Sequence, residues 1–105
     1  MSLSTQQLID KIMEQAKEKK WGIKPEDISV PEKIALIHSE VSEAYEAYRN
    51  NNIEDKHGFK EELGDIIHRV FHLCGIFDID IEKQILKKIE INKNREWDKL
   101  NKKRS

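Results

Sequence analysis

Apolar residues recur along the chain at intervals of three and four, the spacing that places them on one face of an α-helix. Four segments have this pattern, and they cover residues 4–20, 29–49, 55–75 and 80–97. No run of useful length alternates between apolar and polar residues, so strands are not expected. The pattern therefore predicts a protein made only of helices.

Helix-start signals agree with these segments. Ser4 is followed three residues later by Gln7, which is the spacing of a capping box. Ser29 is followed in the same way by Glu32, with a proline in the first turn. The residues expected to cap the third and fourth helices are Asp55 and Asp80.

Short connections between the helices predict that sequential helices pack as antiparallel neighbours. The expected fold is an all-α, antiparallel bundle of about four helices, with one domain over residues 1–98 and a basic, frayed tail at residues 99–105. Within this bundle Ile81, Ile85 and Ile89 are expected to face inward. A chain of 105 residues buries only about two-thirds of the surface of its unfolded state, so we expect a second copy to complete the core.

Composition excludes several classes of protein. The charge is balanced, with 19 basic and 20 acidic residues, so nothing indicates a nucleic acid or an acidic membrane as the main partner. No apolar stretch approaches the roughly 18 residues of a membrane span, and the N-terminus lacks the apolar core of a signal peptide. The single cysteine, Cys74, lies in an apolar run and is expected in the core. These features predict a soluble protein of a reducing compartment, the cytoplasm.

Two pairs of acids are distinguished by where they lie on their helices. Glu40 and Glu43 are three residues apart on the second helix, on or beside the face that should pack. Glu62 and Asp65 are placed in the same way on the third helix. A further acid, Glu46, points to the polar side. Across an antiparallel interface the first two pairs would face each other, so the sequence predicts that four carboxylates converge.

Four partly buried carboxylates repel one another and lose hydration, so they need a compensating charge. Mg²⁺, or Mn²⁺ in its place, prefers oxygen ligands, and Mg²⁺ keeps open positions that phosphates can fill. One face of the fourth helix turns from apolar to cationic, and its lysine and arginine would bind phosphate oxygens. This face carries Lys88, Asn92 and Arg95, and Lys88 is expected level with Asp65. The combination favours a polyphosphate substrate.

At these residues the chain resembles the MazG-like, all-α nucleoside triphosphate pyrophosphohydrolases. The family pattern is ExxE on one helix and ExxD on the next, and it reads here "EVSE" and "ELGD", separated by 18 residues. The resemblance extends over residues 30–97, and the family's C-terminal lysine, asparagine and arginine match Lys88, Asn92 and Arg95.

This resemblance implies a reaction and an assembly. The reaction is Mg²⁺-dependent cleavage of a nucleoside triphosphate between its α and β phosphates, which gives a nucleoside monophosphate and pyrophosphate. The implied assembly is a homodimer or a dimer of dimers. The implied metal ligands are Glu40, Glu43, Glu62 and Asp65.

One position departs from the family pattern. Many members have EExxE, and Ser39 stands where the first glutamate would be. If that glutamate is the general base elsewhere, the role passes here to Glu43 or Glu62, which would accept a proton from the water that attacks the α phosphorus. The alternative is a degenerate site in a non-catalytic helical oligomer or partner-binding module. A phosphoribosyl-ATP pyrophosphohydrolase shares the architecture and is a second enzymatic interpretation.

Other readings of the same residues compete with these. His68 and His72 lie on the same side of the third helix as Asp65, so a zinc or di-iron site is possible, although surface histidines are the simpler interpretation. Salt bridges to the cations of the fourth helix are the alternative to metal binding by the acids. Trp21, which precedes the metal-bearing helix, is expected to stack on the nucleotide base.

Overall fold

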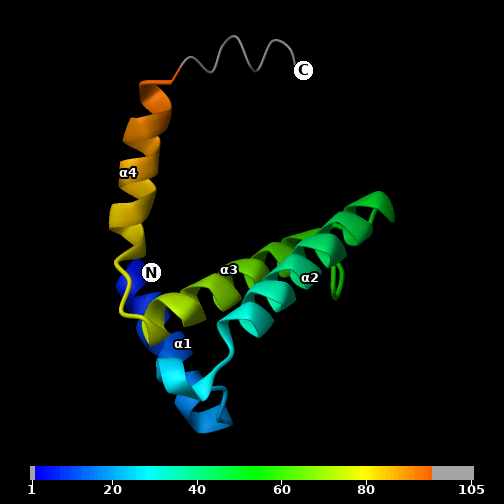
Figure 1. Cartoon of the computed structure of the whole chain (residues 1–105). Helices are drawn as coiled ribbons and strands as arrows, with labels where there is room; N and C mark the ends of the chain where they lie inside the picture. The colour runs from blue at the N-terminus through cyan, green and yellow to red at the C-terminus, as the bar shows by residue number, and fades with distance from the viewer. Residues whose placement is uncertain (1, 96–105) are drawn as a thin grey trace.

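The computed structural model of the chain describes residues 2–95, and all regular structure in this range is helical (Figure 1). The elements are α1 (Thr5–Lys19), the 3₁₀ turn η1 (Pro25–Asp27), α2 (Val30–Arg49), α3 (Phe59–Ile76) and α4 (Ile81–Lys93). The predicted all-α class with four helices is confirmed. The predicted tail at residues 99–105 lies outside the described residues. Within the described range, no helix combines the length and the apolar character needed to cross a membrane.

Three predicted helix starts are confirmed by their caps. Ser4 Oγ accepts a hydrogen bond from the Gln7 backbone N–H at 3.1 Å, and the Gln7 side chain accepts one from the Ser4 N–H at 2.8 Å. The first capping box is therefore complete. Ser29 Oγ accepts from the Glu32 N–H at 3.3 Å, and an Asp80 carboxylate oxygen accepts from the Lys83 N–H at 3.1 Å.

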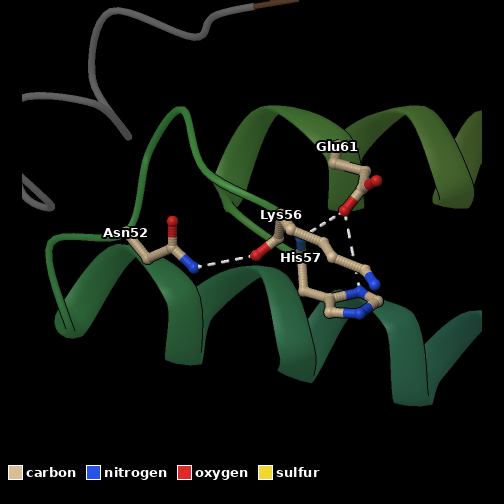
Figure 2. Close-up of polar contacts among 4 residues, drawn as sticks. All are labelled: Asn52, Lys56, His57 and Glu61. Carbon is tan, nitrogen blue, oxygen red and sulfur yellow. Dashed lines mark hydrogen bonds and ion pairs between the residues drawn. The ribbon is translucent and has the colours of Figure 1, made fainter.

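The predicted start of α3 at Asp55 is wrong, because the residues before Gly58 form a loop. The Asp55 carbonyl accepts a hydrogen bond from the Gly58 N–H at 2.8 Å, which closes a turn. The Asn52 side chain donates to the Lys56 carbonyl at 3.2 Å, and Glu61 accepts from the His57 backbone (Figure 2). Helix α3 therefore begins at Phe59, with Gly58 as its N-cap.

Helices α2 and α3 pack side by side as an antiparallel pair, and α1 packs on α3 (Figure 1). The buried apolar residues are few and mostly small: Ile9, Ala16, Ala44, Ala47, Cys74 and Ile76. Cys74 is thus in the core, as predicted. Small residues let the α2 and α3 backbones approach closely, which brings polar side chains on the facing sides of the two helices together.

Helix α4 does not pack against α3 as predicted, but leads away from the α2/α3 pair (Figure 1). Ile85 and Ile89 are 50% and 56% exposed, so the expectation that they face inward is wrong within one chain. The cause is the end of α3, where the Ile79 N–H donates to the Cys74 carbonyl at 2.9 Å and Asp78 is left-handed with φ 52°. This Schellman-type turn ends α3, and the cap at Asp80 starts α4 in a new direction.

Candidate functional site

The structure brings together acids from both members of the α2/α3 pair. Carboxylate oxygens of Glu40, Glu62 and Asp65 all lie within 4.8 Å of one another. Glu43, one turn along α2 from Glu40, is not in that group of ligand atoms, but it lies close enough for the side chain and charge of Glu40 to raise its pKa. The four acids are called the acid cluster below. They converge because the antiparallel packing places the ExxE and ExxD segments at the same level.

Glu62 is the buried member of the acid cluster. It is only 5% exposed, and its Oε2 has no hydrogen-bond partner. Burial raises the pKa of Glu62 to about 7, with further contributions from the hydrogen bond and negative charge of Glu40 and from the charges of Glu43 and Asp65. A buried carboxylate oxygen without a partner is costly unless a cation or a proton satisfies it. The residues present therefore fit a divalent cation.

Arg69 is a site residue that sequence reasoning missed. Its Nε donates to Glu40 Oε1 at 3.2 Å, and both side chains are partly buried. Burial opposes ionisation of Glu40, but hydrogen bonds from Glu62, Glu43 and Arg69 and the positive charge of Arg69 outweigh it, so the pKa of Glu40 lies below its usual value. Its position in the sequence could have indicated this role, because Arg69 lies four residues after Asp65 and therefore on the same face of the helix.

Glu43 has the opposite shift from Glu40. The hydrogen bond and the negative charge of Glu40 raise the pKa of Glu43, and burial adds to this. Neighbouring acids in one cluster thus differ in their tendency to hold a proton. Such a separation of the pKa values of neighbouring acids is typical of groups that share a proton or a cation.

A cavity of about 300 Å³ adjoins the acid cluster on the side of Arg69. Two of its lining side chains are the acids Glu40 and Asp65, and two are the cations Lys33 and Arg69. The remaining wall consists of the three rings of Trp21, His68 and His72. A space between carboxylates, cations and an exposed indole has the chemistry needed to hold a charged ligand with an aromatic part.

His68 and His72 do not form a metal site with Asp65. Within the described residues, the groups of three or more metal-ligating side chains that lie close together contain neither histidine. His72 is 6% exposed, so the surface interpretation is wrong for it, and its Nε2 lies 2.9 Å from the Gly22 carbonyl oxygen. The His68 ring lies edge-on to Trp21, with 5.8 Å between ring centroids. Burial lowers the pKa of His68, which favours the neutral ring, and the charges of His72 and Arg69 add to this against the opposing effect of Asp65.

A second cavity, of about 460 Å³, lies on the other side of Glu62 and is lined by Glu43 and Glu46 among others. Here His57, Glu61 and Glu62 also form a group with ligand atoms within 4.8 Å. The exposed Glu61 carboxylate, however, already accepts from the His57 backbone and lies 3.6 Å from His57 Nδ1 (Figure 2). Glu61 therefore closes the α2–α3 loop, and Glu62 belongs both to this group and to the acid cluster.

The structure does not bring the predicted phosphate-binding face of α4 to the acid cluster within one chain. Because α4 leads away from α3, the expected alignment of Lys88 with Asp65 is not formed (Figure 1). Lys88 is exposed, whereas the Asn92 side-chain oxygen is buried without a hydrogen-bond partner. Arg95, at the end of the described residues, is exposed. Among the residues that the structure describes, the cations that line the cavity beside the acids are Arg69 and Lys33.

An all-α domain that gathers carboxylates from two antiparallel helices beside a cavity belongs to the helical proteins suited to divalent cations. The family model of the MazG nucleotide pyrophosphohydrolase domain matches residues 32–97, and the chain belongs to this family. The matched range includes all four members of the acid cluster, and the family resemblance seen in the sequence is confirmed. No curated protein and no solved structure gave a significant match to the chain.

Proposed function

We propose that the protein is a Mg²⁺-dependent nucleoside triphosphate pyrophosphohydrolase, which cleaves its substrate between the α and β phosphates. Membership of the MazG family supports a nucleotide pyrophosphohydrolase. The observation that carries the proposal is Glu62, a buried carboxylate with an unpartnered oxygen inside a group of acids. An acid in this position needs a proton or a cation, and a nucleoside triphosphate is a ligand that arrives with a cation.

Glu40, Glu62 and Asp65 would hold the cation, with Glu43 as the fourth acid at its edge. Their oxygens are hard ligands, which favour Mg²⁺ or Mn²⁺. When bound, the ion supplies positive charge that neutralises the phosphate oxygens and makes water more acidic. Arg69 keeps Glu40 ionised and oriented through its 3.2 Å hydrogen bond.

A carboxylate has to take the proton of the attacking water, because Ser39 offers no acid at its own position. Glu43 is exposed and borders the larger cavity, so it has access to water, and Glu62 is the second candidate. The proton moves to a carboxylate oxygen while the water oxygen forms a bond to the α phosphorus. The bond from this phosphorus to the bridging oxygen breaks, and pyrophosphate leaves with that oxygen.

The protein is proposed to act as a homodimer or a dimer of dimers. One face of the α2/α3 pair carries an apolar cavity of about 380 Å³, which Tyr45, Tyr48 and Leu63 line among others. Tyr45 is 63% exposed, and exposed aromatic and aliphatic residues this close together favour a partner surface. A second copy would cover this face, and it could supply Lys88, Asn92 and Arg95 to the substrate phosphates.

Light scattering coupled to gel filtration tests the assembly. The wild type should run as a dimer or a tetramer, and Tyr45→Lys should shift it toward the monomer. Ser42→Lys places the same charge on the exposed polar side of α2 and should leave the mass unchanged. A monomeric wild type at micromolar concentration would contradict the proposed assembly.

Activity is tested by incubating the protein with Mg²⁺ and a panel of nucleoside triphosphates, with phosphoribosyl-ATP included, and by identifying the products. Nucleoside monophosphate and pyrophosphate are expected, and orthophosphate as the direct product would contradict the proposed bond. Amide variants of each acid in turn (Glu40→Gln, Glu43→Gln, Glu62→Gln and Asp65→Asn) should abolish turnover. Glu46→Gln, which removes an exposed charge from the same helix, should retain it.

Ser39 favours a second candidate, a helical protein that binds nucleotide without turnover. In that case the panel would yield no product, while Mg²⁺ and nucleotide together would still raise the melting temperature of the protein. Full turnover by the wild type would exclude this candidate.

A further inference from the structure

Trp21 reaches the cavity from a loop whose backbone is held in one conformation. The Trp21 N–H donates to the Ala16 carbonyl at 2.9 Å, which ends α1. An Asp27 carboxylate oxygen accepts from the N–H groups of Ile23 and Lys24 at 3.1 and 3.2 Å. The segment from Trp21 to Asp27 is therefore a structured turn between α1 and α2 (Figure 1).

The conformation of this turn requires a glycine at position 22. Its φ is +103°, a conformation that L side chains rarely adopt. A Cβ at Gly22 would lie 2.7 Å from the Ile28 Cγ2 atom. The carbonyl of Gly22 thus has a defined position, directly next to the residue that carries the indole.

His72 links this carbonyl to α3. Its Nε2 lies 2.9 Å from the Gly22 oxygen, and since a carbonyl only accepts, the Nε2 carries the hydrogen and donates. The bond spans 50 residues of sequence, and it starts from a side chain that is 6% exposed. The His72 ring also lies beside Trp21, with 6.4 Å between ring centroids and 67° between the ring planes. A buried imidazole without this acceptor would be unfavourable, so the bond holds the loop against α3.

His68 makes a useful comparison, because it contacts the same indole without holding the loop. Its ring meets Trp21 at 5.8 Å, but its Nε2 points to Gln15 Oε1 at a longer 3.4 Å. His68 therefore contributes a wall of the cavity. His72 alone of the two donates to the backbone of the turn.

We propose that His72 is a positioning residue for the aromatic base of the substrate, because its hydrogen bond to the Gly22 carbonyl holds the Trp21 indole in the wall of the cavity beside Glu40 and Asp65. The inference rests on the proposed function, since it requires a ligand whose phosphate end lies at the acid cluster. His72 touches neither the phosphates nor the attacking water in this scheme. Its loss should weaken binding of the base and leave the chemical step unchanged.

The first experiment measures the position of Trp21 without any nucleotide. The chain has two tryptophans, so a Trp97→Phe background leaves Trp21 as the single tryptophan, which can be excited selectively over tyrosine. In that background His72→Phe should increase acrylamide quenching of Trp21 by about twofold or more, because the released indole becomes more accessible. His72→Gln keeps an N–H donor near the place of Nε2 and should restore the wild-type quenching. His38→Phe, on the exposed side of α2, is the matched control.

The second experiment is a double-mutant cycle on turnover. Stacking on an aromatic residue has a typical strength that corresponds to about a 5- to 150-fold change in affinity, so Trp21→Ala should raise KM by a factor in this range. His72→Phe should raise KM at least about threefold while kcat stays within about twofold, and His72→Gln should recover most of the loss. In the Trp21→Ala background, His72→Phe should raise KM by less than about 1.5-fold, because the two residues act as one unit.

Three results would overturn the inference. One is unchanged quenching and KM in a folded His72→Phe, and another is a full, independent increase of KM by His72→Phe in the Trp21→Ala background. The third is a fall in kcat as large as the rise in KM. If the wild type shows no turnover at all, the proposed function fails, whereas the quenching comparison still decides whether His72 positions Trp21.

Discussion

Replacing Glu62 with glutamine should remove a loss of stability that the folded protein otherwise undergoes as pH rises. An acid whose pKa is lowered on folding has the opposite effect, because it makes the protein more stable as pH rises. The pKa of Glu62 is raised from 4.5 to about 7 in the folded chain. Between these two values the folded protein holds a proton that the unfolded chain releases. The free energy of unfolding therefore falls as pH rises through this window, and the loss is complete above pH 7.

The magnitude follows from the width of the window. Each pH unit contributes about 1.4 kcal/mol, so the interval from 4.5 to about 7 sets an upper bound of about 3.5 kcal/mol. We expect about 1–3 kcal/mol, because part of the shift comes from Glu40 and Glu43, which titrate themselves. A divalent cation should take the place of the proton. At a hundredfold excess over its Kd, Mg²⁺ would restore about 2.7 kcal/mol at pH 8.

The assay is urea unfolding followed by circular dichroism, at pH 5 and pH 8, with EDTA or with Mg²⁺, and at one fixed protein concentration. In EDTA the wild type should lose about 1–3 kcal/mol more than Glu62→Gln between pH 5 and pH 8. Mg²⁺ should stabilise the wild type at pH 8 and have little effect on Glu62→Gln. Glu90→Gln, an exposed acid on α4, is the control and should follow the wild type. Identical pH dependence in wild type and Glu62→Gln, or a relative gain of the wild type at pH 8, would refute the reasoning.

Other substitutions test the remaining parts of the fold by the same unfolding assay. Arg69→Met should lower stability at pH 7 by about 1 kcal/mol, since it leaves Glu40 without its 3.2 Å partner, and no loss would mean that the pair is not formed. Gly64→Ala should raise stability by about 0.5–1 kcal/mol, because its Cβ would meet no atom within 4 Å inside α3. Gly22→Ala should lower stability by about 1–3 kcal/mol, owing to φ +103° and the contact with Ile28, and a neutral result would show that the turn adapts. Ser29→Ala should cost about 1 kcal/mol by removing the α2 cap, and an unchanged midpoint would argue against that cap.

The helices and their caps could be predicted because they depend on residues close together in the chain. The intervals of three and four indicated all four helices, and Ser4, Ser29 and Asp80 cap them as expected. Helix ends were harder to predict. The chain leaves α1, α2 and α3 through left-handed Lys20, Asn51 and Asp78, where the usual glycine signal is missing.

The acid cluster could be predicted only in part. The ExxE and ExxD spacings place each pair on one helical face, and this follows from helix geometry alone. That the pairs meet depends on the close packing of α2 and α3, which small buried residues such as Ala44 and Ala47 permit. The burial of Glu62, and with it the orphaned oxygen, is a property of that packing.

Contacts between distant segments were not accessible from the local pattern. Three such features join residues from different helices or loops. They are the hydrogen bond from His72 to Gly22, the hydrogen bond from Arg69 to Glu40 and the cavity beside Trp21. The direction of α4 depends on the turn at Asp78. Because of this direction, the apolar and cationic faces of α4 do not pack against α3, the neighbour expected from the sequence. Periodicity states which residues share a face of a helix, but the face that each helix meets depends on how all the helices and turns pack together.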